Sequence, residues 1–141
     1  MILHFNYEEL RALASAIESM VGDGYSSGST AVAAPPETIA LVESLLPRLT
    51  GDVSIETLDD QRRVRLAVGL VVDELHRRMD ERIIEYYPAH EEAVSLYFDY
   101  GHSRAVLARL DGMGTEMEAI LELISGGRPD PSLASTVTFP D

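Results

Sequence analysis

The sequence contains no lysine, no cysteine and no tryptophan, and its 11 basic residues are all arginine. Without a lysine amine the chain cannot build a Walker A phosphate loop, a protein-kinase site or a Schiff base. Without cysteine it has no disulfide, no thiolate zinc site and no cysteine nucleophile. These absences exclude several large classes of enzyme and the small disulfide-rich scaffolds.

Long hydrophobic runs and an excess of positive charge are also missing. The longest apolar run covers residues 66–72, far short of the roughly 20 residues that cross a bilayer. The first residues lack a basic segment followed by an apolar stretch, so we expect no secretory signal and a cytoplasmic location. The formal net charge of -13 repels phosphate backbones and anionic lipids, so we expect neither nucleic acid nor a membrane as partner.

What remains is the composition of an ordinary globular protein, with 45% hydrophobic and 25% charged residues in 141. The patterning predicts an all-α fold, a bundle of four to five helices built on a long antiparallel helical hairpin. Residues 1–126 are expected to form a single helical domain. Residues 127–141, with three prolines, are expected to form an extended, irregular tail, and the Gly/Ser-rich residues 22–34 a flexible loop.

The first two helices are predicted from their start signals. Asn6 and Glu9 have the spacing of a capping box, with Asn in place of Ser or Thr, so a helix is expected over 7–21. Pro36 opens a second helix, expected over 36–46, and Pro47 is expected to break or kink its last turn.

The third helix is predicted over 58–87, with Thr57 and Asp60 at its start and Pro88 at its end. Such a helix is about 45 Å long, whereas a compact domain of this size is about 37 Å across. The helix therefore overhangs, which predicts that a second copy packs along its protruding end to form a homodimer. The interface residues expected there are Met79, Ile83, Tyr86 and Tyr87.

The remainder is predicted as a fourth helix over 89–111, an interruption at Gly112 and Gly114, and a fifth helix over 115–126. Residues 135–139 are also considered as a short strand beside residues 1–5. The buried face of the fourth helix is expected to consist of Ala93, Val94, Tyr97, Tyr100, Gly101, Ala105 and Ala108. That of the fifth is expected to consist of Met117, Ile120, Leu121 and Ile124.

Two D-x-x-H pairs are candidates for a divalent-metal site: Asp73 with His76, and Asp99 with His102. A carboxylate and an imidazole three residues apart share a helix face and can chelate a metal, as in di-metal helical bundles. A helical wheel, however, places Asp73, Asp99 and His102 away from the apolar stripes. That orientation favours surface ion pairs at i, i+4 spacing, in which Asp73 pairs with Arg77, Glu74 with Arg78 and His76 with Asp80.

Arg104 is the second candidate, because the wheel places it among small and aromatic residues. In one interpretation its stem packs at an edge and its head reaches water. In the other, Arg104 and the phenols of Tyr97 and Tyr100 hold an anionic ligand or a partner's carboxylate in a cleft.

The function expected from these features is a self-associating interaction module. Its acidic surface is expected to engage a basic protein partner, as an inhibitor or immunity-type protein would. The alternatives are a helical metalloprotein that uses the two D-x-x-H pairs, and a binder of small anions that uses Arg104.

Overall fold

The computed structural model describes residues 1–22, 36–86 and 91–126. The flexible loop and the irregular tail predicted from sequence lie outside the described residues, apart from Gly22, which ends the first helix. The elements are, in order, β1 (Ile2–His4), α1 (Tyr7–Gly22), α2 (Pro36–Glu43), the 3-10 helix η1 (Leu46–Arg48), β2 (Asp52–Ser54), α3 (Leu58–Tyr86) and α4 (Glu91–Gly126).

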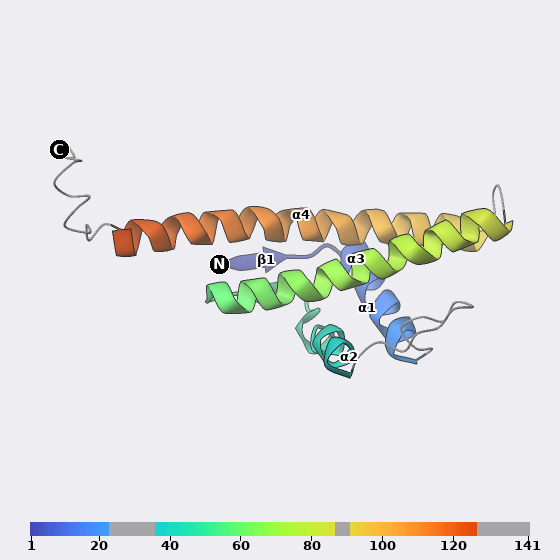
Figure 1. Ribbon diagram of the computed structural model, residues 1–141, viewed down its shortest axis with the longest axis horizontal. Helices are drawn as coiled ribbons and strands as arrows, with labels where there is room; N and C mark the ends of the chain where they lie inside the picture. Colours follow the sequence, from blue (N-terminus) through green and yellow to red (C-terminus); the bar gives the residue numbers. More distant parts are fainter. Residues whose placement is uncertain (23–35, 87–90, 127–141) are drawn as a thin grey trace.

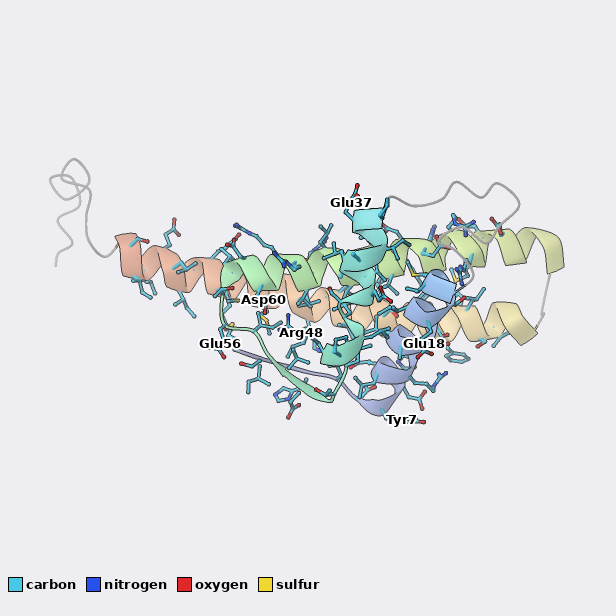
Figure 2. All side chains as sticks on the ribbon, turned by 90° about the horizontal axis from the view of Figure 1, so that it is seen from below. Tyr7, Glu18, Glu37, Arg48, Glu56 and Asp60 are labelled. Carbon is cyan, nitrogen blue, oxygen red and sulfur yellow. The ribbon has the colours of Figure 1, made fainter. Side chains whose placement is uncertain are left out.

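The fold is mostly helical and is built on α3 and α4, which pack as an antiparallel pair (Figure 1). Helix α1 packs against both of them, more extensively against α4, while α2 packs against α1 and α3. Figure 2 shows α1 and α2 crossing one side of the long pair. The predicted helical hairpin is therefore confirmed, and the core forms where these four helices meet. Its largest fully buried side chains include Leu13, Ile17, Val68, Val71 and Leu110.

The predicted helix starts are confirmed by their caps. The backbone N–H of Glu9 donates to Asn6 Oδ1 at 2.8 Å, and the backbone N–H of Asn6 donates to Glu9 Oε1 at 3.0 Å. This exchange satisfies two helix-terminal donors. At α3, the N–H of Asp60 donates to Thr57 Oγ1 at 3.0 Å.

Helix α2 ends three residues earlier than expected, at Glu43. Pro47 cannot continue an α-helix, and it sits within η1 instead. The break brings Arg48 to α3, where its guanidinium donates to both carboxylate oxygens of Asp60 at 2.7 and 2.8 Å (Figure 2). Asp60 therefore anchors the connecting segment as well as opening α3.

A two-stranded antiparallel sheet departs from the all-α expectation. β1 pairs with β2 in the register Ile2–Ser54, Leu3–Val53 and His4–Asp52. Leu3 and Val53 face the core. Strands of three residues carry too little alternation to be recognised in sequence. The segment considered as a partner for residues 1–5, residues 135–139, lies outside the described residues.

The expected break after the fourth helix is wrong, since α4 runs without interruption from Glu91 to Gly126. Gly112 and Gly114 are helical residues within it. A Cβ on Gly114 would lie 2.8 Å from Nε2 of Gln61, a buried residue of α3. Gln61 Nε2 donates to the backbone oxygen of Leu110 at 2.7 Å. Gly114 thus admits a buried side chain to the backbone of α4, and does not end a helix.

The expected buried face of the fourth helix is also wrong. Val94, Tyr97, Gly101, Ala105 and Ala108 are exposed. Helix α4 instead turns its larger aliphatic side chains inward, because alanine and glycine offer little apolar area to remove from water. The face that α4 buries contains Leu96, Asp99, Ser103, Val106, Leu110 and Met117.

The C-terminal end of α3 projects past α1 together with the start of α4, as predicted, and α4 forms a second overhang at its other end (Figure 1). Helix α4 has 36 residues against 29 in α3, and it extends past the N-terminal end of α3 (Figure 1). Met117 is buried as expected. Ile120, Leu121 and Ile124 are 44%, 44% and 64% exposed and not buried, because α3 no longer covers them.

Replacing the two helical glycines of α4 by alanine tests this packing. Gly112→Ala should stabilise the fold by about 1 kcal/mol, because alanine is the better helix former and nothing lies within 4 Å of its Cβ. Gly114→Ala should lose that gain and about 1–3 kcal/mol more, because Gln61 must give up its buried hydrogen bond. Urea unfolding at low protein concentration measures both variants. Equal gains would contradict the packing described.

Candidate functional site

A cleft of about 470 Å³ lies on one flank of the α3–α4 pair. It contains all three residues predicted to hold an anion, joined by one histidine of the predicted metal set. Helix α3 contributes two side chains, and α4 contributes the rest. Its lining residues are His76, Met79, Tyr97, Tyr100, Gly101, Arg104 and Ala105.

The ring of Tyr100 organises this cleft. The guanidinium carbon of Arg104 lies 5.8 Å from the Tyr100 ring centroid, a distance at which the cation is attracted by the ring face. The ring of His76 lies 5.5 Å from the same ring. Tyr97 is 63% exposed and is one helical turn before Tyr100 and Gly101, so its ring is available to a bound molecule.

Arg104 differs from most of the arginines that the structure describes, because it has no carboxylate within ion-pair distance. Arginines 11, 48, 62, 65, 77, 78 and 109 each pair with at least one acid. Among the described residues, the interaction that the Arg104 guanidinium makes is the one with the Tyr100 ring. In a chain with 24 acidic residues, an unpaired, exposed guanidinium beside two phenols is suited to a carboxylate or a phosphate.

The four residues of the predicted metal site are not brought together. Asp73 is exposed, and His76 Nδ1 lies 3.5 Å from Asp80, as the ion-pair interpretation predicts. Asp99, expected to be solvated, is only 8% exposed and faces α1, while His102 is half-buried. Within residues 1–22, 36–86 and 91–126, no group of three or more His, Asp or Glu residues is placed to hold a metal ion.

The predicted interface residues lie mostly beyond what the structure describes. Met79 is 8% exposed and belongs to the core, where it also lines the cleft. The side chains of Ile83 and Tyr86, and the whole of Tyr87, are outside the described residues.

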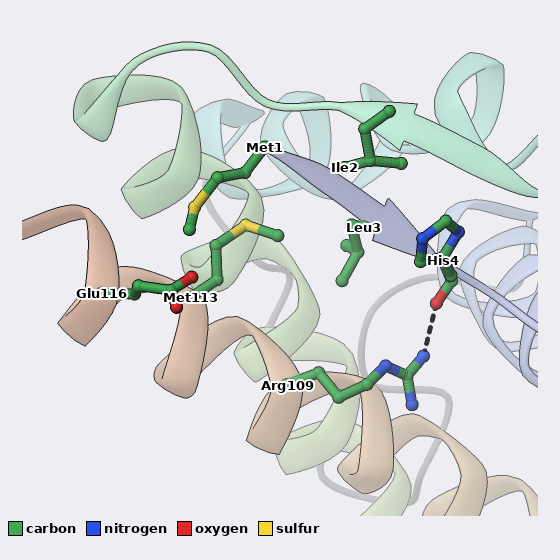
Figure 3. Close-up of a pocket in the computed structure, with 7 residues that line it drawn as sticks. All are labelled: Met1, Ile2, Leu3, His4, Arg109, Met113 and Glu116. Carbon is green, nitrogen blue, oxygen red and sulfur yellow. Dashed lines mark hydrogen bonds between the residues drawn. The ribbon is translucent and has the colours of Figure 1, made fainter. Parts of the chain in front are cut away.

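Sequence reasoning missed the polar contacts that bind α1 to α4. Arg109 donates to both oxygens of the buried Glu9 carboxylate at 2.8 and 2.6 Å, and to the backbone oxygen of His4 at 2.7 Å. Figure 3 shows this last bond at one end of a cleft beside β1, of about 480 Å³. The Arg109 bonds hold the pKa of Glu9 below its usual value, against the effect of burial. No local spacing signals this pair, whose members lie 100 residues apart.

Asp99 lies in the same contact between α1 and α4, but its pKa is shifted in the opposite direction from that of Glu9. Burial raises its pKa, and Arg11, whose guanidinium is 3.6 Å away, only partly offsets this. Asp99 Oδ1 and Ser103 Oγ are both buried without a hydrogen-bond partner in the described structure. Because a buried carboxylate without hydrogen bonds is costly to ionise, Asp99 weakens the contact that Glu9 strengthens.

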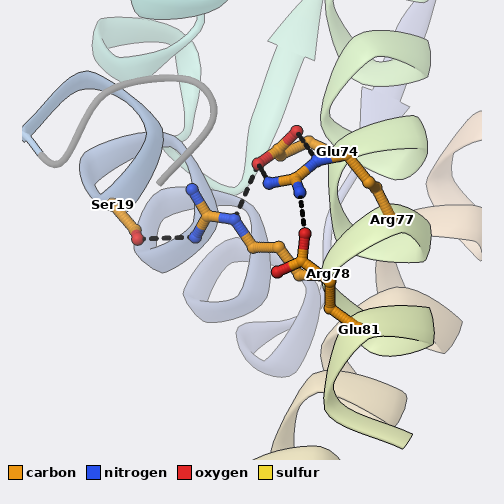
Figure 4. A network of polar contacts seen from close by, with 5 residues as sticks. All are labelled: Ser19, Glu74, Arg77, Arg78 and Glu81. Atoms are coloured by element: carbon orange, nitrogen blue, oxygen red, sulfur yellow. Dashed lines mark hydrogen bonds and ion pairs between the residues drawn. The ribbon is translucent and has the colours of Figure 1, made fainter. Parts of the chain in front are cut away.

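A second polar network joins α3 to α1 (Figure 4). The buried Glu74 carboxylate accepts two hydrogen bonds from Arg77 at 3.1 and 2.7 Å and one from Arg78 Nε at 2.8 Å. Arg78 also donates to Ser19 Oγ at 2.7 Å. The predicted pairing of Glu74 with Arg78 is confirmed, whereas Arg77 pairs with Glu74 and Glu81 and not with Asp73.

Comparison with known proteins gives no family to which this chain can be assigned. The sequence matches no protein-family model, no curated protein and no solved structure. In the described part of the chain, no helix is long and apolar enough for a membrane span. The function is therefore inferred from the residues and their geometry.

Neutralising Glu9 and Asp99 should change the pH dependence of stability in opposite directions. The lowered pKa of Glu9 stabilises the fold above its unfolded-state value, and this contribution is lost as the pH falls through the folded-state value. Glu9→Gln should therefore cost about 1–3 kcal/mol at pH 7. The raised pKa of Asp99 means that stability is lost as the pH rises, so Asp99→Asn should be neutral or stabilising at pH 7.

Thermal unfolding of the two variants between pH 3 and pH 8 measures this difference. The defect of Glu9→Gln should shrink as the pH falls, and any gain of Asp99→Asn should shrink in the same direction. Parallel losses in both variants at pH 7 would show that Asp99 is a stabilising ion-pair partner of Arg11.

Proposed function

We propose that this protein is a self-associating interaction module whose second copy packs on the outer face of α4. The observation that carries the proposal is a set of bulky apolar side chains left in solvent on that face: Val94, Tyr97, Phe98 and Leu123 are 47%, 63%, 60% and 75% exposed. Between them lie small exposed residues. The outer face of α4 is defined here as Val94, Tyr97, Phe98, Gly101, Ala105, Ala108, Gly112, Thr115, Ala119 and Leu123.

The spacing of these residues suits contact with another helix. From Val94 to Ala119, one residue of the face recurs after alternating steps of four and three, the heptad spacing of helix pairs, and Leu123 follows after a further step of four. Its central glycine and alanine residues let a neighbouring backbone approach closely. None of its residues is charged, and the exposed Glu116 lies at its edge, where a carboxylate can stay in water when a second helix covers the face.

The face is complementary to itself in an antiparallel arrangement. When two copies of α4 are paired about a midpoint between Ala108 and Arg109, Val94 of one copy lies opposite Leu123 of the other. In the same register Phe98 lies opposite Ala119, Ala105 lies opposite Gly112, and Gly101 lies opposite Glu116 at the edge of the face. Each copy thus uses the same patch, as in an isologous dimer.

The size of the face limits the affinity. From Val94 to Leu123 it is about 44 Å long and about 10 Å wide, from the helix rise and diameter. Two copies would bury about 900 Å² in total, below the roughly 1,200–2,000 Å² of stable complexes. An interface of this size belongs to the weak, transient class, so the dimer should form only at high protein concentration.

A charge placed at the centre of the face should abolish self-association. Ala105→Glu puts a carboxylate opposite Gly112 of the second copy, in the middle of the contact. The fold of the monomer is unaffected, because Ala105 is exposed. Sedimentation equilibrium over a concentration series should show a weight-average mass that rises for the wild type and stays monomeric for Ala105→Glu. Ala40→Glu, on the exposed side of α2, is the control and should dimerise normally.

Salt should strengthen this self-association. Two copies of net charge -13 repel each other, and the screening length falls from about 10 Å at 0.1 M to about 3 Å at 1 M salt. A dimer that weakens with added salt, or one that persists in Ala105→Glu, would contradict the outer face of α4 as the contact.

The unpaired Arg104 supports a second candidate function, the binding of a small anion in the flanking cleft. Arg104 supplies the charge, while Tyr97 and Tyr100 supply hydroxyl groups and ring surface. His76 lies against the Tyr100 ring in the same cleft and can donate a hydrogen bond to the anion.

Phosphate and benzoate are suitable probes for this cleft. Each should raise the unfolding temperature of the wild type in a concentration-dependent way, by linkage of binding to folding. Arg104→Gln should abolish the increase, and Arg63→Gln should leave it intact, since Arg63 is an exposed arginine away from the cleft. The same increase in Arg104→Gln would exclude this function.

A further inference from the structure

A second apolar surface lies at the end of α4 that α3 does not cover. It is a groove of about 420 Å³ bounded by the N-terminus, the segment before α3 and the last turns of α4. We call it the terminal groove, and its lining residues are Met1, Glu56, Thr57, Leu58, Met117, Ile120, Leu121 and Ile124. It is separate from the outer face of α4, with which it shares no residue.

The terminal groove continues the contact that α4 makes with α3. Leu110 and Met117 are buried residues of α4, and Leu121 and Ile124 follow at the next helical steps on the same side of the helix. Helix α3 begins only at Leu58, so this stripe runs on into solvent (Figure 1). A helix that lies in line with α3 would cover it with the same packing that α3 provides.

The charges around the groove indicate what kind of helix fits. Glu56 lines the groove, and Asp59 and Glu122 are exposed beside groove residues. In the described structure none of these three acids pairs with an arginine. Two positive groups nearby are engaged: the Met1 ammonium donates to Ile55 O at 2.9 Å, and Arg62 pairs with Glu118 at 3.2 Å.

We propose that the terminal groove binds a basic amphipathic helix of a partner protein. Its apolar side packs on Leu121 and Ile124, in line with α3. Its arginine or lysine residues face Glu56, Asp59 and Glu122. A second copy of this chain is the weaker occupant, because it brings the same acidic rim and a charge of -13. The proposal does not depend on the outer face of α4.

A labelled synthetic peptide of about 15 residues, about four helical turns, tests this directly. Its leucines are set at heptad spacing and its other positions are arginine, and fluorescence anisotropy measures its binding to the full chain. The wild type should bind it, and raising the salt from 0.05 to 0.5 M should weaken the binding severalfold. The same peptide with glutamate in place of arginine should not bind.

Two neighbouring variants make the test specific to the groove. Ile124→Asp should weaken peptide binding by at least about tenfold, because it puts a charge where an aliphatic side chain is buried by the peptide. Leu123→Asp, one residue earlier but on the outer face of α4, should bind the peptide like the wild type. Both positions are largely exposed, and unchanged circular dichroism confirms that the variants fold.

The same two variants distinguish peptide binding in the terminal groove from self-association through the outer face of α4. Ile124→Asp should keep the concentration-dependent mass that Leu123→Asp loses. The proposal is overturned if the wild type does not bind the arginine peptide, if the glutamate peptide binds as tightly, or if Ile124→Asp and Leu123→Asp bind equally. It is also overturned if Ile124→Asp alone makes the protein monomeric, since the groove would then hold a second copy.

Discussion

The packing of large aliphatic side chains between α3 and α4 determines the rest of the molecule. Helix α4 carries two competing apolar faces, one of leucine, valine and methionine and one of alanine, glycine and aromatic residues. The first removes more area from water when it is buried, so it turns toward α3. The second is consequently left on the surface. Because α4 is also the longer helix, its buried stripe runs beyond α3 and ends in the terminal groove. Both proposed contact surfaces therefore follow from the same packing choice.

Charge acts on this framework mainly through arginine. Glu9 and Glu74 are buried acids, each held by arginine hydrogen bonds, and through them α1 is attached to the long pair. Since a buried carboxylate must be paired, these contacts fix where α1 lies. Arg104 is left outside this network, and its guanidinium lies against the ring of Tyr100 in the flanking cleft. It is therefore available to an anion.

The sequence was informative where the signals are local. The capping residues Asn6 and Thr57 and the start of α3 follow from spacing and appear in the structure. The predictions failed where residues distant in the sequence determine the local structure or the burial of a side chain. Gly114 makes room for Gln61 of another helix and does not end its own, and Asp99 is buried because α1 covers it. The strand pair Ile2–His4 and Asp52–Ser54 is too short to leave a periodic signal. For the cleft, helical periodicity grouped Arg104, Tyr97 and Tyr100, whereas His76 joined them only through the packing of α3 on α4.

The absence of cysteine from the chain makes disulfide trapping the most direct test of the self-association geometry. Ala108→Cys places one thiol near the midpoint of the antiparallel contact, where two copies bring the positions together. Ala119→Cys places it about 30 Å from its counterpart, from the helix rise of about 1.5 Å per residue. Under mild oxidation at a protein concentration above the dissociation constant, Ala108→Cys should give a covalent dimer on a non-reducing gel and Ala119→Cys should not. Equal cross-linking of both variants, or none in Ala108→Cys, would contradict an antiparallel dimer through the outer face of α4.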